Sequence, residues 1–282
     1  MRSHLLASLL LLPTTLTAQA HNPARVIRDS AIALDATGKG TDARIIWQKL
    51  IDEAATPAAK AQAQRRMAMS WGFEGDCANA MKYHNMVIDY WKTREFDEPQ
   101  NAFYQQGEMA NESGRVCLDI GELDVAHQLY QLGSELGNKE PEPRTHPKSL
   151  WDFRLAHAEA RIDARRGKKA EAEKHVAEAR RALDSDPAMA QNQERYFPIL
   201  VGYVALYTGD LATAARKFDE ALAIDENNDD AYITYLLGVT HEKMGHVDAA
   251  IEYYEKAYKG VQGSHNPPAA LIRREVGKKA RP

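Results

Sequence analysis

The chain has 282 residues, with 36 basic and 40 acidic side chains and a formal net charge of −4. This mild acidity argues against general nucleic-acid binding, which requires a basic face. Alanine is abundant, strand-like runs of Val, Ile and Thr are almost absent, and apolar residues recur at helical spacing. The sequence therefore predicts an all-α fold.

Residues 1–20 have the pattern of a secretory signal. Arg2 is followed by an apolar run from Leu5 to Leu12 and by a final Ala-Gln-Ala. The run is too short to span a bilayer, and no other stretch approaches the roughly 18 apolar residues that a transmembrane helix needs. We expect cleavage before His21 and an exported protein, periplasmic or secreted, without a membrane span.

The stretch 195–258 contains one unit twice, at an interval of 36 residues. Small residues let two antiparallel helices approach closely, an aromatic fills the space beside them, and glycine suits the bend between the helices. The matched pairs are Gly202 and Gly238, Gly209 and Gly245, Ala214 and Ala250, Phe218 and Tyr254, and Ala221 and Ala257.

This pattern resembles the tetratricopeptide repeat, a helix–turn–helix unit of about 34 residues with small residues at the crossing and a late aromatic. The last two units match best, although Glu226 stands where the family usually has Pro. The resemblance implies a right-handed α-solenoid. It also implies a concave side, formed by the first helix of each pair, that binds protein or peptide partners.

Fainter copies of the unit precede this stretch. Each has a bend glycine with an alanine five residues later, as the last two units have. Over all six units these glycines are Gly38, Gly75, Gly121, Gly167, Gly209 and Gly245. We predict a single solenoid domain over residues 21–260, with about six repeats over 24–57, 58–93, 98–138, 147–184, 190–226 and 229–260. The Pro-bearing connections 93–101, 138–149 and 183–194 should cluster at one edge of the stack.

Residues 261–282 are predicted to form a capping helix, from about 268 to 278, and a basic tail. A terminal repeat must cover its open face, so Leu271, Ile272 and Val276 should face inward while Arg273 and Arg274 stay in solvent. The alternative is that these basic side chains attract an acidic partner.

Cys77 and Cys117 are the two cysteines of the chain. The first lies at the start of a predicted second helix and the second near the end of the next first helix, at a similar height in the stack. A disulfide would fit an exported protein, and its loop of about 41 residues would contribute roughly 4 kcal/mol to stability. The alternative is two small buried thiols.

The sequence contains no pattern typical of an enzyme or a metal site. His241 and His246 are five residues apart with a bend glycine between them, which differs from the four-residue spacing of a zinc-protease helix. The other histidines lack ligand spacing, and we expect His84 to be a packed core histidine. Catalytic and phosphate-binding motifs are absent, so we expect no enzyme activity and no cofactor.

The first helices are expected to line a concave groove of two characters. Arg and Asn in the middle repeats would donate to carboxylates and carbonyls, and tyrosines in the last two repeats would bury large surfaces. The alternatives are a solvated arginine face and tyrosines that form part of the core. The candidate binding residues are Arg65, Asn111, Arg115, Arg154, His157, Arg161, Tyr196, Tyr203, Tyr207, Tyr232 and Tyr235.

Five of these side chains are similar in type to the carboxylate clamp of chaperone-binding tetratricopeptide proteins, although their register differs from that clamp's Lys–Asn pattern. They are Arg65, Asn111, Arg115, His157 and Arg161. We therefore expect an exported interaction scaffold that binds an extended, acidic or C-terminal peptide segment. Substituting Glu for Arg115 and Arg161 should abolish binding without lowering the melting temperature. The alternative function is assembly, by self-association or by docking of the Tyr-rich repeats on an envelope or secretion complex.

Overall fold

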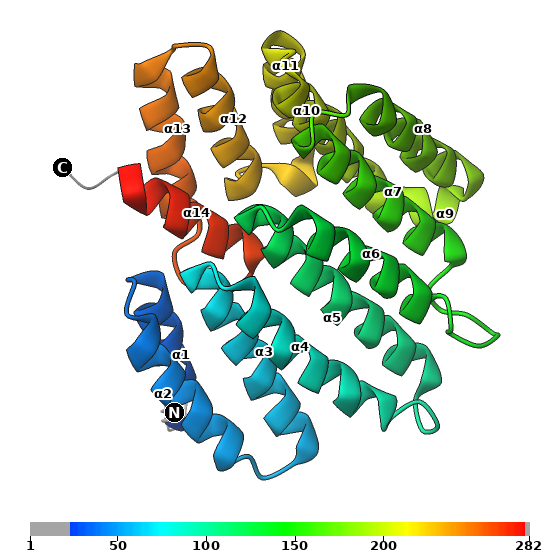
Figure 1. The fold of residues 1–282 in the computed structure, drawn as a ribbon, viewed down its shortest axis with the longest axis vertical. Helices are drawn as coiled ribbons and strands as arrows, with labels where there is room; N and C mark the ends of the chain where they lie inside the picture. Colours follow the sequence, from blue (N-terminus) through cyan, green and yellow to red (C-terminus); the bar gives the residue numbers. More distant parts are fainter. Residues whose placement is uncertain (1–22, 280–282) are drawn as a thin grey trace, which may run out of the picture.

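The computed structural model describes residues 23–279, which form helices joined by short connections, with no strand in that range (Figure 1). Twelve helices form six antiparallel pairs that stack in chain order. The pairs are α1 (Pro23–Ala36) with α2 (Gly40–Asp52), α3 (Pro57–Glu74) with α4 (Cys77–Lys92), α5 (Pro99–Ile120) with α6 (Leu123–Gly137), α7 (Lys148–Arg165) with α8 (Lys169–Ser185), α10 (Phe197–Thr208) with α11 (Leu211–Leu222), and α12 (Ala231–Lys243) with α13 (Val247–Gly260). The predicted all-α solenoid is confirmed. The predicted signal, 1–20, and the last tail residues, 280–282, lie outside the described residues.

The six glycines predicted to lie at bends all have positive φ and lie at or just after the ends of first helices. Gly121 illustrates the reason. Its φ is 105°, and its N–H donates to the carbonyl of Cys117 near the end of α5. A side chain at this φ would be strained, so glycine ends the helix and reverses the chain.

Small residues and aromatics of the repeat meet as the 36-residue pattern predicts. A Cβ atom added to Gly202 would lie 2.7 Å from the Phe218 ring, and one added to Gly238 would lie 2.7 Å from the Tyr254 ring. The alanine five residues after each bend glycine is buried in all six pairs; these are Ala43, Ala80, Ala126, Ala172, Ala214 and Ala250. The close approach of the paired helices therefore follows directly from these residue types.

The long connections lie at one edge, as expected. Gln100 donates to the carbonyl of Pro143, and Ser149 donates to the Asp186 carboxylate at 2.6 Å, so each connection is bonded to the next. The third connection contains an unexpected helix, α9 (Pro187–Gln193), followed by the 3₁₀ turn η1 (Glu194–Tyr196). Consequently the fifth pair begins at Phe197 rather than near residue 190.

The last helix, α14 (Pro267–Lys279), does more than cover the sixth repeat. It lies between the α12–α13 pair and the first repeats, and it packs on α3 and α5 as well as on α12 and α13 (Figure 1). The inward side chains Leu271, Ile272 and Val276 are buried as predicted. The expectation that Arg273 and Arg274 stay in solvent was wrong.

Both arginines of α14 pack against the protein. Arg274 donates to the carbonyls of Gly72 and Asp119 at 3.3 and 3.1 Å, and the Arg273 guanidinium lies 4.0 Å from the centre of the Tyr258 ring. The Gly72 and Asp119 carbonyls lie in the last turns of α3 and α5, where helix carbonyls lack intrahelical partners. Arg274 therefore fastens α14 to the second and third repeats.

A buried polar cluster joins the first repeat to the segment before α14. The Asp35 carboxylate accepts hydrogen bonds from Trp47 Nε1 at 3.0 Å, Ser70 Oγ at 2.6 Å and His265 Nε2 at 2.9 Å. The His265 ring also stacks on Phe73, with 5.3 Å between ring centres. Because His265 lies 230 residues after Asp35, these contacts link the two ends of the described chain.

The structure joins Cys77 at the start of α4 to Cys117 near the end of α5, with 5.0 Å between the two Cα atoms. His84, the residue expected to pack in the core, is fully buried. Over the described range, no helix has both the length and the apolar character required to cross a membrane.

Candidate peptide-binding site

The concave side is lined by α3, α5, α7, α10 and α12, but it is not one continuous trough. Three hollows contain the predicted site residues, and residues of α14 help to line two of them. We call them the apolar groove, the central pit and the tyrosine cavity. The predicted site residues are distributed among all three.

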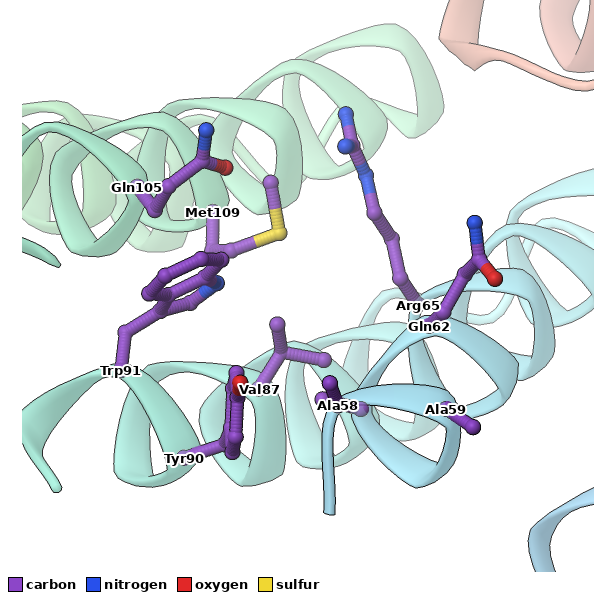
Figure 2. Close-up of a pocket in the computed structure, with 10 residues that line it drawn as sticks. Ala58, Ala59, Gln62, Arg65, Val87, Tyr90, Trp91, Gln105 and Met109 are labelled. Carbon is purple, nitrogen blue, oxygen red and sulfur yellow. The ribbon is translucent and has the colours of Figure 1, made fainter. Parts of the chain in front are cut away.

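The apolar groove is the largest of the three, with a volume of about 480 Å³, and lies between α3, α4 and α5. Figure 2 shows Tyr90 and Trp91 on one side and Gln62 and Arg65 on the other, with Met109 above the space between them. Of the predicted residues only Arg65 lies here. The aromatic side was not predicted, because Val87, Tyr90 and Trp91 belong to the second helix α4 and the repeat pattern indicates a binding surface on first helices alone.

The central pit has a volume of about 300 Å³ and collects the Arg and Asn side chains of the middle repeats. Six predicted residues line it: Asn111, Arg115, Arg154, His157, Arg161 and Tyr196. They come from α5, α7 and the 3₁₀ turn η1, and Pro267 at the start of α14 forms part of the wall. These six side chains, predicted from helical spacing, therefore share one hollow.

Two arginines place fixed positive charges in the pit. Arg115 bonds to Asp119 one turn later, at 2.8 Å, and its guanidinium lies 4.2 Å from the centre of the Tyr232 ring. Burial alone would lower the pKa of Arg115, but the charge and hydrogen bond of Asp119, together with Tyr232 and Tyr130, raise that pKa above its usual value. Arg161 is 5% exposed and donates to the Tyr130 hydroxyl at 3.0 Å.

The partners of these guanidinium groups are incomplete. Within residues 23–279, no carboxylate forms an ion pair with Arg161, and the buried Nη2 of Arg115 has no hydrogen-bond acceptor. His157 does not add a third charge, because burial and repulsion from Arg161 and Arg115 hold its pKa well below the ordinary value. The pit thus combines two permanent cations with a neutral imidazole.

Ion pairs form the wall between the pit and the apolar groove. Arg65 pairs with Glu112, and the other oxygen of Glu112 lies 3.1 Å from His84 Nε2. Burial alone would raise the pKa of Glu112, but the hydrogen bonds and charges of His84 and Arg65 lower it to about 2. Arg154 likewise forms an ion pair, with Glu108. These two arginines are therefore partly neutralised, unlike Arg161.

The tyrosine cavity, of about 250 Å³, lies beneath α14 and is lined by Tyr203, Tyr207, Tyr232 and Tyr235. Tyr203 is 2% exposed and the other three are half-buried. Burial raises the pKa of Tyr207, Tyr232 and Tyr235 above the ordinary value, so their hydroxyls stay protonated. These four tyrosines thus line one cavity while contributing to the core, which combines the predicted groove position with its alternative.

The environment of Arg115 and Arg161 changes the stability expected of their double Glu substitution. That expectation required both side chains to project into solvent. Arg161 is buried against Tyr130, and Arg115 bridges the third and sixth repeats through Asp119 and Tyr232. Carboxylates placed there would be buried beside Asp119 and Glu112, and we now expect them to destabilise the fold.

No protein-family model matches the sequence. A segment of 72 residues is 33% identical to the Photosystem I assembly protein Ycf3 of Rippkaea orientalis (strain PCC 8801 / RF-1), covering 25% of this chain and 42% of that protein. The match thus spans less than half the length of this relative. The crystal structure of MamA aligns with 67% of this chain and 94% of its own, at 18% identity and a TM-score of 0.32.

Proposed function

We propose that this chain is a protein-interaction scaffold that binds an extended peptide segment of a partner, with a carboxylate in the central pit. The stacked helical pairs and the short similarity to a protein named for an assembly role support the general function. The specific observation is Arg161, a buried arginine that lines the pit without an ion-pair partner among the described residues.

A carboxylate suits this position because a guanidinium binds it through two parallel hydrogen bonds. Asn111 supplies a neutral amide at the same wall, beside the Arg115 guanidinium that pairs with Asp119. A phosphate would bring more negative charge than the pit offsets, since Glu108 and Glu112 also line it. We therefore favour an acidic side chain or a C-terminal carboxylate.

The apolar groove would hold the neighbouring part of the same segment. It is separated from the pit by the Arg65–Glu112 pair, and its Trp91 and Met109 offer the aromatic and flexible apolar surfaces common at peptide anchors. A segment that places an apolar side chain a few residues before its carboxylate would contact both hollows.

The test compares random peptides carrying a free C-terminal carboxylate with the same peptides amidated. We expect the free acids to bind more tightly, by a factor of about 10–100, which corresponds to roughly 1.5–3 kcal/mol for a hydrogen bond to a charged group. Arg161→Met removes the charge while keeping the length of the side chain and should abolish this difference. Arg216→Met, on the outer helix α11, is the control for loss of one arginine.

Melting curves of both variants show whether Arg161→Met is folded. Trp91→Ala should weaken the binding of all the peptides while preserving the preference for a free carboxylate. Equal binding of free and amidated peptides by the wild type, or a preference that survives Arg161→Met in a folded variant, would refute the proposal.

We also propose that the protein is exported. This rests on the signal-like residues 1–20 and on the disulfide, since disulfides persist in oxidising compartments. Mass spectrometry of the natural protein should find an N-terminus at His21. A natural protein that retains residues 1–20 would contradict it.

A further inference from the structure

A second cluster of chemically active side chains lies away from the concave side, where α6, α7 and α8 meet. It consists of His127 on α6, Glu159 and Asp163 on α7, and His175 and Glu178 on α8, and we call it the α6–α8 cluster. In Figure 1 these three helices lie side by side in the green part of the chain. A cavity of about 300 Å³, lined by four of the five residues, gives access to it.

The helix geometry explains how these side chains meet. Glu159 and Asp163 are four residues apart on α7, and His175 and Glu178 are three apart on α8, so each pair lies on one helix face. The two helices are antiparallel and paired, which brings the two faces together. Carboxylate and histidine pairs at this spacing on facing helices are a common way of building metal sites inside helical bundles.

Three atoms lie close enough together to bind one metal ion. One oxygen of Glu159, one of Glu178 and a nitrogen of His175 all lie within 4.8 Å of one another. His175 Nδ1 is 3.4 Å from Glu159 Oε2 and 2.7 Å from Glu178 Oε2. Three ligands each about 2.0–2.2 Å from a Zn²⁺ ion would have such separations after small side-chain movements.

The second nitrogen of His175 supports the same interpretation. Nε2 lies 3.5 Å from Asp163 Oδ2, so the ring directs this nitrogen to one carboxylate and Nδ1 to two others. Histidines that bind metal usually donate their other N–H to a carboxylate, which fixes the tautomer and orients the ring. A bound cation would take the place of the proton in the 2.7 Å contact between Nδ1 and Glu178, and the ring would then direct Nε2–H to Asp163.

His127 holds Glu159 in place from the other side. Its Nε2 lies 3.2 Å from Glu159 Oε1, which leaves Oε2 directed at His175. Glu178 is oriented similarly, since its Oε1 is 3.9 Å from Lys174 and 3.7 Å from Arg181 while Oε2 faces His175. Each carboxylate thus has one oxygen used by a neighbour and one directed to the common centre.

We propose that the α6–α8 cluster binds a divalent transition-metal ion, with Glu159, His175 and Glu178 as ligands and with Asp163 and His127 as positioning residues. An imidazole with carboxylates favours Zn²⁺ or a similar first-row ion over Mg²⁺, which prefers oxygen ligands alone. Because the ligands come from the two helices of one pair and His127 comes from the preceding pair, the ion would brace the contact between the third and fourth repeats.

The experiment titrates the EDTA-treated, non-reduced protein with Zn²⁺ in competition with a chromogenic chelator. We expect one saturable site in the wild type that millimolar Mg²⁺ does not displace, and a rise in melting temperature with Zn²⁺. His175→Asn and Glu178→Gln should remove the site. Asp163→Asn should weaken it by about 10–100-fold, as losing a partner of a ligating histidine commonly does.

Two control variants match these changes in chemistry. His246→Asn removes a histidine of the exposed His241–His246 pair, whose Nδ1 atoms are 3.3 Å apart, and Glu173→Gln removes an exposed carboxylate of α8. Both should leave the site intact. Melting curves of the metal-free variants report whether each one folds, and Co²⁺ absorption spectra of wild type and Asp163→Asn distinguish altered coordination from altered folding.

Several results would overturn the proposal. One is the absence of saturable Zn²⁺ uptake together with a His175 ring protonated at both nitrogens by NMR, which would mean that a proton alone bridges the carboxylates. A second is displacement of the bound Zn²⁺ by millimolar Mg²⁺. A third is Zn²⁺ uptake that persists in His175→Asn and disappears in His246→Asn.

Discussion

The substitution Asp35→Asn tests whether the buried polar cluster holds the two ends of the array together. The Asp35 carboxylate is fully buried and accepts three hydrogen bonds, from Trp47, Ser70 and His265. Asparagine keeps the size of the side chain, but its NH₂ group replaces one carboxylate oxygen. A donor would then face one of the donors of Trp47, Ser70 or His265. Hydrogen bonds to charged groups contribute about 1.5–3 kcal/mol each, so the three together set an upper limit of about 4–9 kcal/mol.

Relaxation and entry of water reduce this cost, and we expect the free energy of unfolding to fall by about 3–5 kcal/mol, which is large for one substitution. Urea denaturation measures the loss. Hydrogen exchange locates it, since the amides of α14 should exchange faster than those of α10 and α11 once His265 has lost its acceptor.

Asp29→Asn is the matched control. It lies on the same helix, with its side chain 52% exposed and paired only with Arg25 and Arg28 at the surface, where an ion pair contributes less than about 1 kcal/mol. If Asp35→Asn also costs less than about 1 kcal/mol, or if α14 keeps its protection against exchange, the cluster does not fasten the ends and our reasoning is wrong.

Two further predictions concern pH and close packing. Because the pKa of Glu112 falls from 4.5 unfolded to about 2 folded, its ionised form stabilises the protein fully above pH 4.5, and this contribution, about 3 kcal/mol, is lost as the pH falls from 4.5 through 2. When the free energy of unfolding is measured against pH, Glu112→Gln should lack this loss between pH 4.5 and 2. A pH dependence parallel to that of the wild type would contradict the prediction. Gly238→Ala should lower stability by about 1–3 kcal/mol because the new Cβ would lie 2.7 Å from the Tyr254 ring. Gly277→Ala, in α14 with no atom within 4 Å of the new Cβ, should raise stability by about 0.5–1 kcal/mol, and equal effects of the two changes in thermal melts would refute the packing argument.

The parts of the fold that were predictable depend on local residue types. A glycine such as Gly121 must end a helix wherever φ is positive, and an alanine such as Ala126 must lie where two helices cross, so both can be located from sequence spacing alone. The same spacing placed Asn111, Arg115 and Arg161 on one side of the stack, and they do line one pit.

What could not be predicted depends on curvature and on distant contacts. Periodicity shows that Arg115 and Tyr232 face the concave side but not that the stack bends tightly enough to bring them within 4.2 Å of one another. Nor does any local pattern link Asp35 to His265. The α6–α8 cluster escaped notice for a related reason, because its ligand spacing becomes apparent only when α7 and α8 are paired.

The crossing of α14 has a mechanical consequence. Repeat arrays with free ends stretch and compress like springs, because each unit touches only its neighbours. Here Arg274 ties the far end to α3 and α5, so the coil cannot lengthen without breaking those bonds. A partner would therefore bind a concave surface whose width is already fixed. The scaffold would lose less conformational entropy on binding than a flexible repeat array would. For the same reason, deleting α14 should increase the flexibility of the first repeats as much as that of the last.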